Sequence, residues 1–118
     1  MFSMSDKEKF LGEFEQFILL SILKLSDNAY GSAIRQLLAE AVRRDVTIGA
    51  LYTTLERLEK KGLITSKVGE VTPERGGRAK KYFKLTAQGQ KALKRSKEAL
   101  INMWQGLSLF SQQNVCSL

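Results

Sequence analysis

The stretch from Thr47 to Gly62 constrains the fold of this chain more than any other. Apolar side chains recur in it at steps of three and four, so they share one face of a helix. The hydroxyl of Thr47 can accept a hydrogen bond from an amide of the first turn, and Gly62 can take the left-handed conformation that ends a helix. The sequence therefore predicts a helix with an inward face made of Ile48, Leu51, Leu55 and Leu58.

The opposite face of this helix carries small and hydrogen-bonding side chains, where a merely soluble helix would carry dense charge. Small residues let another surface approach closely, while Tyr, Thr and Arg side chains offer hydrogen bonds. We interpret this face as a contact surface. Its residues are Gly49, Ala50, Tyr52, Thr53, Glu56 and Arg57.

Positive charge is concentrated in the part of the chain that follows. The 118 residues carry a net charge of +7. Residues 57–97 hold thirteen Lys and Arg against three Asp and Glu, a net charge of +10, whereas the segments on either side are slightly negative. Such asymmetry indicates a polyanionic partner; a solvated basic face is the simpler alternative.

The composition argues against catalysis, metal binding and membrane insertion. The chain has no histidine and a single cysteine, Cys116, so the commonest general base and the usual zinc ligands are missing. No glycine-rich phosphate loop follows a strand. No apolar run approaches the roughly 20 residues of a membrane span, and no signal pattern stands at the start. We expect no enzyme, no cofactor, no metal site and no membrane partner, and we expect a cytoplasmic protein.

A second helix precedes the Thr47 helix. Tyr30 and Gly31 lead into it; we expect it to run from near Ser32 to about Val42, with residues 43–45 as a polar turn. A helix, a tight turn and a helix with small outer side chains form a helix-turn-helix, whose second helix enters the DNA major groove. Spacing alone is weak support, because many helical bundles contain such pairs.

Two strands joined by a basic loop follow the Thr47 helix. Residues 63–69 and 79–85 are rich in β-branched and aromatic side chains, and Pro73 and the glycines at 76–77 predict a turn between them. Such a hairpin is the wing of a winged helix-turn-helix. Its cations, which can neutralise DNA phosphates, are Arg75, Arg78, Lys80 and Lys81.

The first and last helices carry apolar stripes that a second protomer could cover; for the first helix, the alternative is that both stripes are ordinary core. The helix expected over residues 10–25 has two apolar stripes, so it must be covered on two sides. The last helix, capped by Thr86, repeats apolar residues at steps of three and four to form a seam for a partner helix. We predict a dimer whose contacts include Phe10, Phe17, Leu93, Leu100, Met103, Trp104 and Leu107.

Several motifs together resemble the PadR family of bacterial transcriptional regulators. They are Ala29-Tyr-Gly, the run from Gly49-Ala-Leu-Tyr to Ile64, and the run Thr72-Pro-Glu-Arg-Gly-Gly-Arg-Ala-Lys-Lys-Tyr. The resemblance extends from about residue 11 to residue 107. It implies a winged helix-turn-helix, a homodimer built with the C-terminal helix and a roughly palindromic DNA operator; most members repress transcription. The resemblance is to the short members, which we expect to lack the long C-terminal effector region of the larger ones.

Two aromatic residues have alternative roles. In some PadR-like multidrug sensors, aromatic residues of the terminal helix line a drug cavity between protomers, so Trp104 is a candidate contact for a small-molecule inducer. Filling the dimer core is the alternative for Trp104. Tyr52 either contacts DNA or packs its ring against the second helix.

The fold class predicted from the sequence is mainly α with a small β-wing. Residues 1–85 form an N-terminal helix plus the winged helix-turn-helix, and residues 86–118 form a dimerisation helix and a tail. The predicted function is a homodimeric repressor on double-stranded DNA, and a protein-interaction module is the alternative. Arg57 and the wing would hold phosphates. The expected groove contacts are Thr47, Gly49, Ala50, Tyr52 and Thr53.

Overall fold

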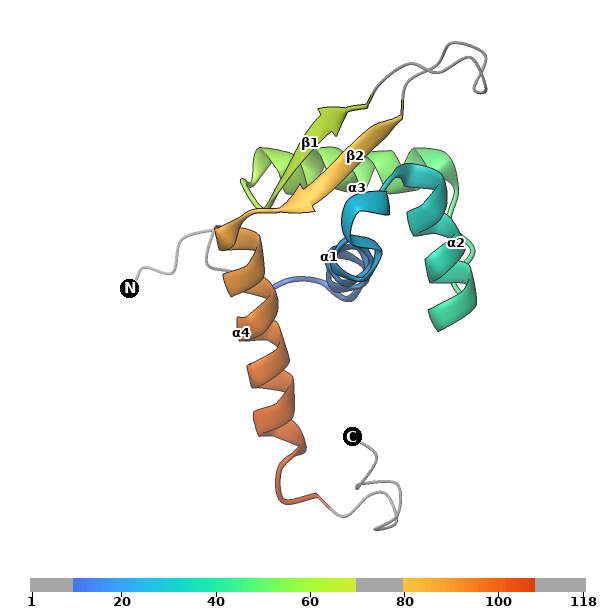
Figure 1. Cartoon of the computed structure of the whole chain (residues 1–118). Coiled ribbons are helices and arrows are strands. Elements are labelled where there is room, and N and C mark those ends of the chain that lie inside the picture. The colour runs from blue at the N-terminus through green and yellow to red at the C-terminus, as the bar shows by residue number, and fades with distance from the viewer. Residues whose placement is uncertain (1–9, 70–79, 108–118) are drawn as a thin grey trace.

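The computed structural model describes residues 10–69 and 80–107. It contains four helices, a short 3₁₀ turn and a two-stranded sheet (Figure 1). This confirms the predicted mainly helical, winged helix-turn-helix fold. The elements in chain order are α1 (Glu13–Leu25), η2 (Ser26–Asn28), α2 (Gly31–Val42), α3 (Ile48–Lys60), β1 (Ile64–Val68), β2 (Lys81–Leu85) and α4 (Ala87–Trp104).

The core forms where α1 meets α2, α3, β2 and α4. Each of these elements buries one apolar face, because its apolar residues recur at the period of a helix or a strand. Fully burying one such side chain contributes about 1.5–3 kcal/mol, so this shared core determines how the elements are oriented. The largest fully buried side chains are Ile18, Leu19, Ile34, Leu51, Leu55, Leu58 and Ile64.

The ends of α3 follow the sequence prediction. The Thr47 hydroxyl accepts a hydrogen bond from the Ala50 amide at 3.1 Å, and Gly62 takes a positive φ of 81° just after the helix. Arg43 ends α2 in the left-handed conformation, and the Arg35 Nε atom donates to the Val46 carbonyl at 2.8 Å. The turn between α2 and α3 is therefore fixed at its start by the backbone conformation of Arg43 and near its end by the hydrogen bond to Val46.

The two strands pair antiparallel, from Ile64 opposite Leu85 to Val68 opposite Lys81. A third segment joins the sheet in a way that the sequence did not reveal. The Phe83 amide donates to the Ala29 carbonyl at 2.9 Å, and Tyr30 forms a bridge with Tyr82. The start of α2 is therefore attached directly to the wing.

One helix boundary and the places of two apolar side chains were not foreseen from the sequence. The first helix begins at Glu13 rather than Phe10, with Gly12 as its N-cap. Ile48 is 47% exposed, because none of the described elements covers the first turn of α3 on that side. Leu93, predicted as a dimer contact, is buried in the core of the chain, whereas Leu100 and Met103 of the same helix are exposed.

A close approach at the start of α4 makes a prediction about Gly89. A Cβ atom at Gly89 would collide with the Leu63 carbonyl group, which also accepts the Thr86 amide hydrogen bond at 3.0 Å. We expect Gly89→Ala to lower the free energy of unfolding by about 1–3 kcal/mol, as overpacking does. Urea denaturation measures this.

Gly49→Ala is the matched control, because a Cβ atom there meets nothing within 4 Å. Alanine is the better helix former by up to about 1 kcal/mol, so this variant should be as stable as the parent or more so. Equal losses in the two variants would contradict the close approach at Gly89.

Candidate nucleic-acid interface

The outer face of α3 is exposed and small. Leu51, Leu55 and Leu58 are fully buried on the inner side, so the rotation of the helix about its axis is determined. Gly49, Ala50 and Thr53 are exposed on the outside, and Glu56 lies on the same side. Thr47 is also exposed, but its hydroxyl already caps the helix. This surface has the small, exposed side chains that let a helix enter a DNA groove.

Tyr52 lies at the edge of this face and has a packing role. Its ring is half-buried against the core, with its centroid 6.2 Å from that of Phe83. Its hydroxyl end lies so close to Gly31 that a Cβ there would collide with it. The structure thus places Tyr52 against the first turn of α2, the alternative role that the sequence left open. Direct DNA contact by Tyr52 stays a prediction.

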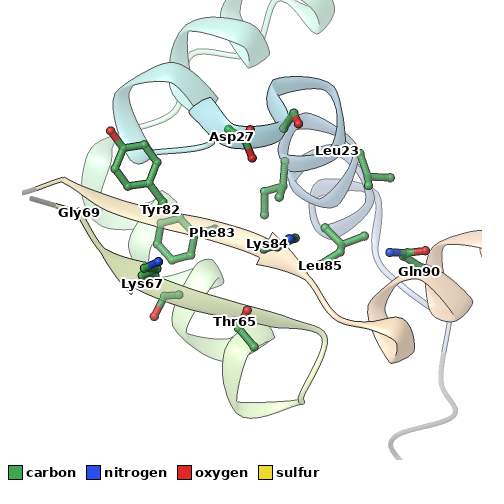
Figure 2. Close-up of a pocket in the computed structure, with 13 residues that line it drawn as sticks. Leu23, Asp27, Thr65, Lys67, Gly69, Tyr82, Phe83, Lys84, Leu85 and Gln90 are labelled. Carbon is green, nitrogen blue, oxygen red and sulfur yellow. The ribbon is translucent and has the colours of Figure 1, made fainter.

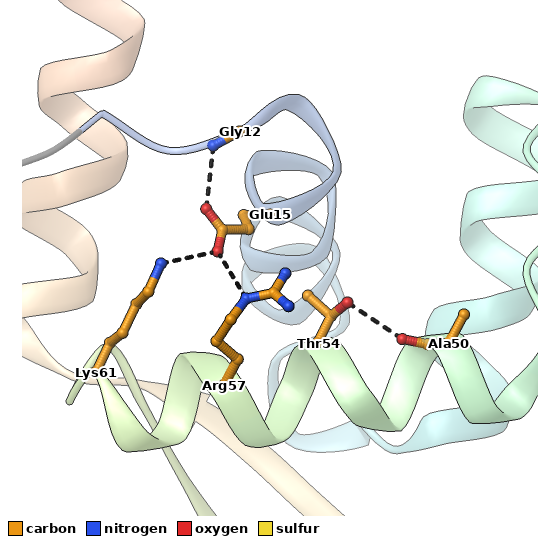
Figure 3. A network of polar contacts seen from close by, with 6 residues as sticks. All are labelled: Gly12, Glu15, Ala50, Thr54, Arg57 and Lys61. Carbon is orange, nitrogen blue, oxygen red and sulfur yellow. Dashed lines mark hydrogen bonds and ion pairs between the residues drawn. The ribbon is translucent and has the colours of Figure 1, made fainter.

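Arg57 points toward α1 rather than outward. Its Nε atom lies 3.5 Å from the Glu15 carboxylate, and Lys61 Nζ lies 3.0 Å from the same oxygen (Figure 3). The other Glu15 oxygen accepts the Gly12 amide at 3.0 Å. The Arg57 side chain remains 51% exposed, so part of it still faces solvent. The structure therefore adds a role that the sequence did not predict, which is to tie α3 to α1.

The Glu15 carboxyl is charged at neutral pH despite its burial. Burial raises the pKa of Glu15, but the Gly12 hydrogen bond and the positive charges of Lys61 and Arg57 together outweigh it. The pKa of Glu15 consequently lies below its ordinary value of 4.5.

Two of the predicted wing cations lie at the open end of the two strands, around Gly69, Lys80 and Lys81, which we call the root of the wing because the wing loop begins there. Lys80 Nζ lies 3.6 Å from the centroid of the Tyr30 ring, whereas Lys81 is exposed on the edge strand. Figure 1 shows that the open ends of β1 and β2 point to the side of the molecule where α2 and the first turn of α3 lie. Arg75 and Arg78 lie outside the described residues. The open end of the wing and the first turn of α3 therefore lie on the same side of the protein (Figure 1).

The sequence analysis did not single out Lys67 and Lys84. Both are exposed and lie on the outer face of the sheet, where Lys67 is directly opposite Tyr82. Alternation along a strand assigns each side chain to one of two faces of the sheet, so it could have indicated these lysines. Which residues of the two strands share a face depends on the pairing register, which the sequence does not give.

An open hollow of about 640 Å³ lies between the outer face of the sheet, the end of α1 and η2 (Figure 2). Asp27, Lys67 and Lys84 contribute charges to it, and Leu23 and Leu85 contribute apolar surface. Trp104, the candidate inducer contact, does not line it. Among the described residues no cluster of His, Cys, Asp or Glu suits a metal ion.

The predicted dimer contacts fall into two groups. Phe10, Leu100 and Met103 line one shallow hollow between the start of α1 and α4, and Met103 is 75% exposed. Leu107 and Trp104 are exposed further along. Leu93 and Phe17 belong instead to the protomer: Leu93 is in the core, and the Phe17 ring lies 5.5 Å from the Arg44 guanidinium. At least part of their apolar surface is therefore used within the chain, and their contribution to a dimer stays a prediction.

The family model of the transcriptional regulator PadR-like family matches residues 19–95, which is more than half of the chain. The chain belongs to this family. Its members are transcriptional regulators rather than enzymes. No curated protein matches the chain significantly. None of the helices in the described part of the chain is long and apolar enough to cross a membrane.

Solved structures of transcriptional regulators share the fold. A PadR-like transcription factor from Bacteroides fragilis is 33% identical with a TM-score of 0.64, and the match covers 76% of this chain and 82% of that one. A transcriptional regulator from Clostridium thermocellum is 25% identical with a TM-score of 0.64, over 83% and 92% of the two chains. A PadR family regulator from Clostridium difficile is 27% identical with a TM-score of 0.58, over 79% and 99%.

The tie between α1 and α3 predicts how stability depends on pH. Since the pKa of Glu15 is lower in the folded than in the unfolded state, its stabilising effect is present above about pH 4.5 and is lost as pH falls through the folded pKa. We expect Glu15→Gln to reduce the free energy of unfolding by about 1–2 kcal/mol at pH 7. The difference from the parent should shrink toward pH 3 in urea titrations.

Glu13→Gln is the control, because Glu13 forms an exposed ion pair with Arg44 and such pairs contribute about 0–1 kcal/mol. A Glu15→Gln difference that stays constant between pH 7 and pH 3 would refute the role of the charge.

Proposed function

We propose that this PadR-like protein is a homodimeric repressor that binds a specific double-stranded DNA operator. The observation that carries the proposal is the exposed, small-residue face of α3, whose orientation is determined by a buried leucine face. Membership of a family of transcriptional regulators supports it. The net charge of +10 over residues 57–97 supplies the sequence-independent attraction to phosphates.

In the proposed complex, α3 lies in the major groove with its first turns against the base edges. Gly49 and Ala50 permit close approach, and the exposed Thr53 hydroxyl can donate to or accept from a base. Lys80 and Lys81 at the root of the wing contact phosphates. Arg75 and Arg78 are expected from the sequence to do the same beyond the described part of the wing. Base contacts would then supply the sequence preference, while phosphate contacts position the protein.

One protomer supplies one half-site, so a second protomer is needed for a palindromic operator. We propose that the exposed apolar residues of α4 pair with those of a second copy, together with Phe10. Two symmetric copies of α3 would then meet successive major grooves about 34–36 Å apart. The proposed seam consists of Leu100, Ile101, Met103 and Trp104 of α4 and of Leu107 just beyond its end; Ile101 was not predicted from the sequence.

Repression requires only that the bound dimer exclude the transcription machinery from the operator. A small molecule that inserts near Trp104 between the protomers would change the angle between them and spoil the half-site spacing. By linkage, such an inducer would bind the free dimer more tightly than the DNA-bound dimer.

A winged-helix module that docks a protein through α3 is the second candidate. The observation that favours it is the exposed apolar side chain of Ile48 beside Gly49 and Thr53. The concentration of positive charge favours DNA, since charged residues are depleted at the core of protein interfaces.

DNA binding is tested by titrating the full chain with random duplex at several salt concentrations. A dimer that makes about 6–10 phosphate contacts should lose roughly 10³–10⁵ in affinity between 50 and 200 mM salt, because counterions are released on binding. Fluorescence anisotropy measures the affinity. The absence of measurable binding at 50 mM salt would reject the repressor proposal.

Sequence reading is tested on an operator selected from a random library with the same protein. Thr53→Ala should weaken operator binding by about 5- to 100-fold while leaving random-duplex binding within about twofold, as expected for a lost base contact. Thr53 is exposed, so the variant should keep its fold. Equal losses on both duplexes would remove Thr53 from the base-reading set.

The dimer is tested by Leu100→Asp, which places a charge in the proposed seam. We expect sedimentation to show monomers, because an unpaired buried charge costs several kcal/mol. Lys91→Asp is the control, since Lys91 is exposed on the opposite side of α4. A Leu100→Asp variant that remains dimeric would place the interface elsewhere.

A further inference from the structure

The ammonium group of Lys80 is held in one place before any partner arrives. Lys80 Nζ lies 3.6 Å from the centroid of the Tyr30 ring, a close cation–π contact. The Lys80 carbonyl accepts the Gly69 amide at 2.7 Å, which holds the backbone beneath this side chain. Lys80 is half-buried, so its donors that point away from the ring are the ones left for a partner.

The position of Tyr30 is fixed by contacts of both its backbone and its ring. Tyr30 forms a β-bridge with Tyr82, and their rings meet edge to face with centroids 5.6 Å apart. The neighbouring Ala29 carbonyl accepts the Phe83 amide at 2.9 Å. The pair of Tyr30 and Tyr82 therefore links the segment before α2 to the root of the wing.

Lys81 provides a contrast within the same strand. It is exposed, and its Nζ atom lies 6.0 Å from the centroid of the Phe83 ring, at the limit of a cation–π contact. Alternate residues of a strand point to opposite faces, so Lys80 shares a face with Tyr82 and Lys81 does not. Two adjacent lysines of equal charge thus differ in how strongly the protein orients them.

We propose that Tyr30 is a positioning residue, which holds Lys80 in place over the root of the wing to contact one DNA phosphate. The inference rests on the proposed DNA-binding function and adds a residue that touches no DNA itself. A long flexible side chain loses rotamer freedom when it binds, and the contact with the Tyr30 ring restricts Lys80 before binding. A partly desolvated ammonium also attracts a phosphate more strongly than a fully hydrated one.

The test is a double-mutant cycle on random-duplex affinity with the full chain. We expect Lys80→Ala to weaken binding by about tenfold and Tyr30→Leu to weaken it by about two- to tenfold, the effect of freeing one long side chain. The double variant should bind no more weakly than Lys80→Ala alone, because without Lys80 the ring has nothing to orient. Tyr30→Phe keeps the ring face and should bind within about twofold of the parent.

Lys81→Ala is the matched control for the cycle. The fold-losses of affinity caused by Lys81→Ala and by Tyr30→Leu should multiply in the double variant, because Tyr30 does not hold Lys81. Losses of Tyr30→Leu and Lys80→Ala that multiply would overturn the proposal, as would a Tyr30→Leu variant that binds like the parent. If Lys80→Ala has no effect while the parent binds DNA, the inference fails and the proposed function stands; if the parent binds no duplex, the proposed function fails.

A second measurement does not depend on any variant folding. In the NMR spectrum of the free parent protein, the ε-methylene protons of Lys80 should be shifted upfield by the Tyr30 ring current, and the shift should persist on addition of duplex. Ordinary Lys80 shifts in the free protein would refute the preorganised contact, whatever the affinities.

Discussion

The burial of the leucine face of α3 in the shared core is the constraint on which the rest of the structure depends. Leu51, Leu55 and Leu58 are completely buried, and α1 forms the centre of the core that covers them. A helix buried on one side has one outward side, so this packing points Gly49 and Thr53 into solvent. The charged contacts of Glu15 add to the same arrangement, because they join the C-terminal end of α3 to the start of α1.

The wing is attached at two places to the helices that form the core. Its inner face packs through Phe83 and Leu85 into the core, while Ala29 and Tyr30 pair with β2 along its edge. The start of α2, the outer face of α3 and the cations at the root of the wing are therefore parts of one packed unit. Elements fixed to one another in this way have less freedom to lose when the protein binds a partner.

Much of the fold was predictable from local patterns. The helix ends at Thr47, Gly62 and Thr86 depend on capping chemistry within a few residues, and the structure contains all three. The inward placement of Ile48 was wrong, and Leu93, predicted as a dimer contact, lies in the core of the chain. A period of three or four assigns a residue to a face, but it contains no information about which element covers that face. No described element covers Ile48, whereas Leu93 packs within its own protomer.

The sequence by itself determined the element types, the helix caps, the concentration of positive charge and the small outer face of α3, because all of these are local properties of the chain. Only the tertiary structure decided that Arg57 contacts Glu15, that Tyr52 packs against Gly31 and that Lys80 lies over Tyr30. Each of these contacts joins residues that are far apart in the chain. Their formation depends on the packing angles of whole helices and on the strand register, which no local pattern specifies.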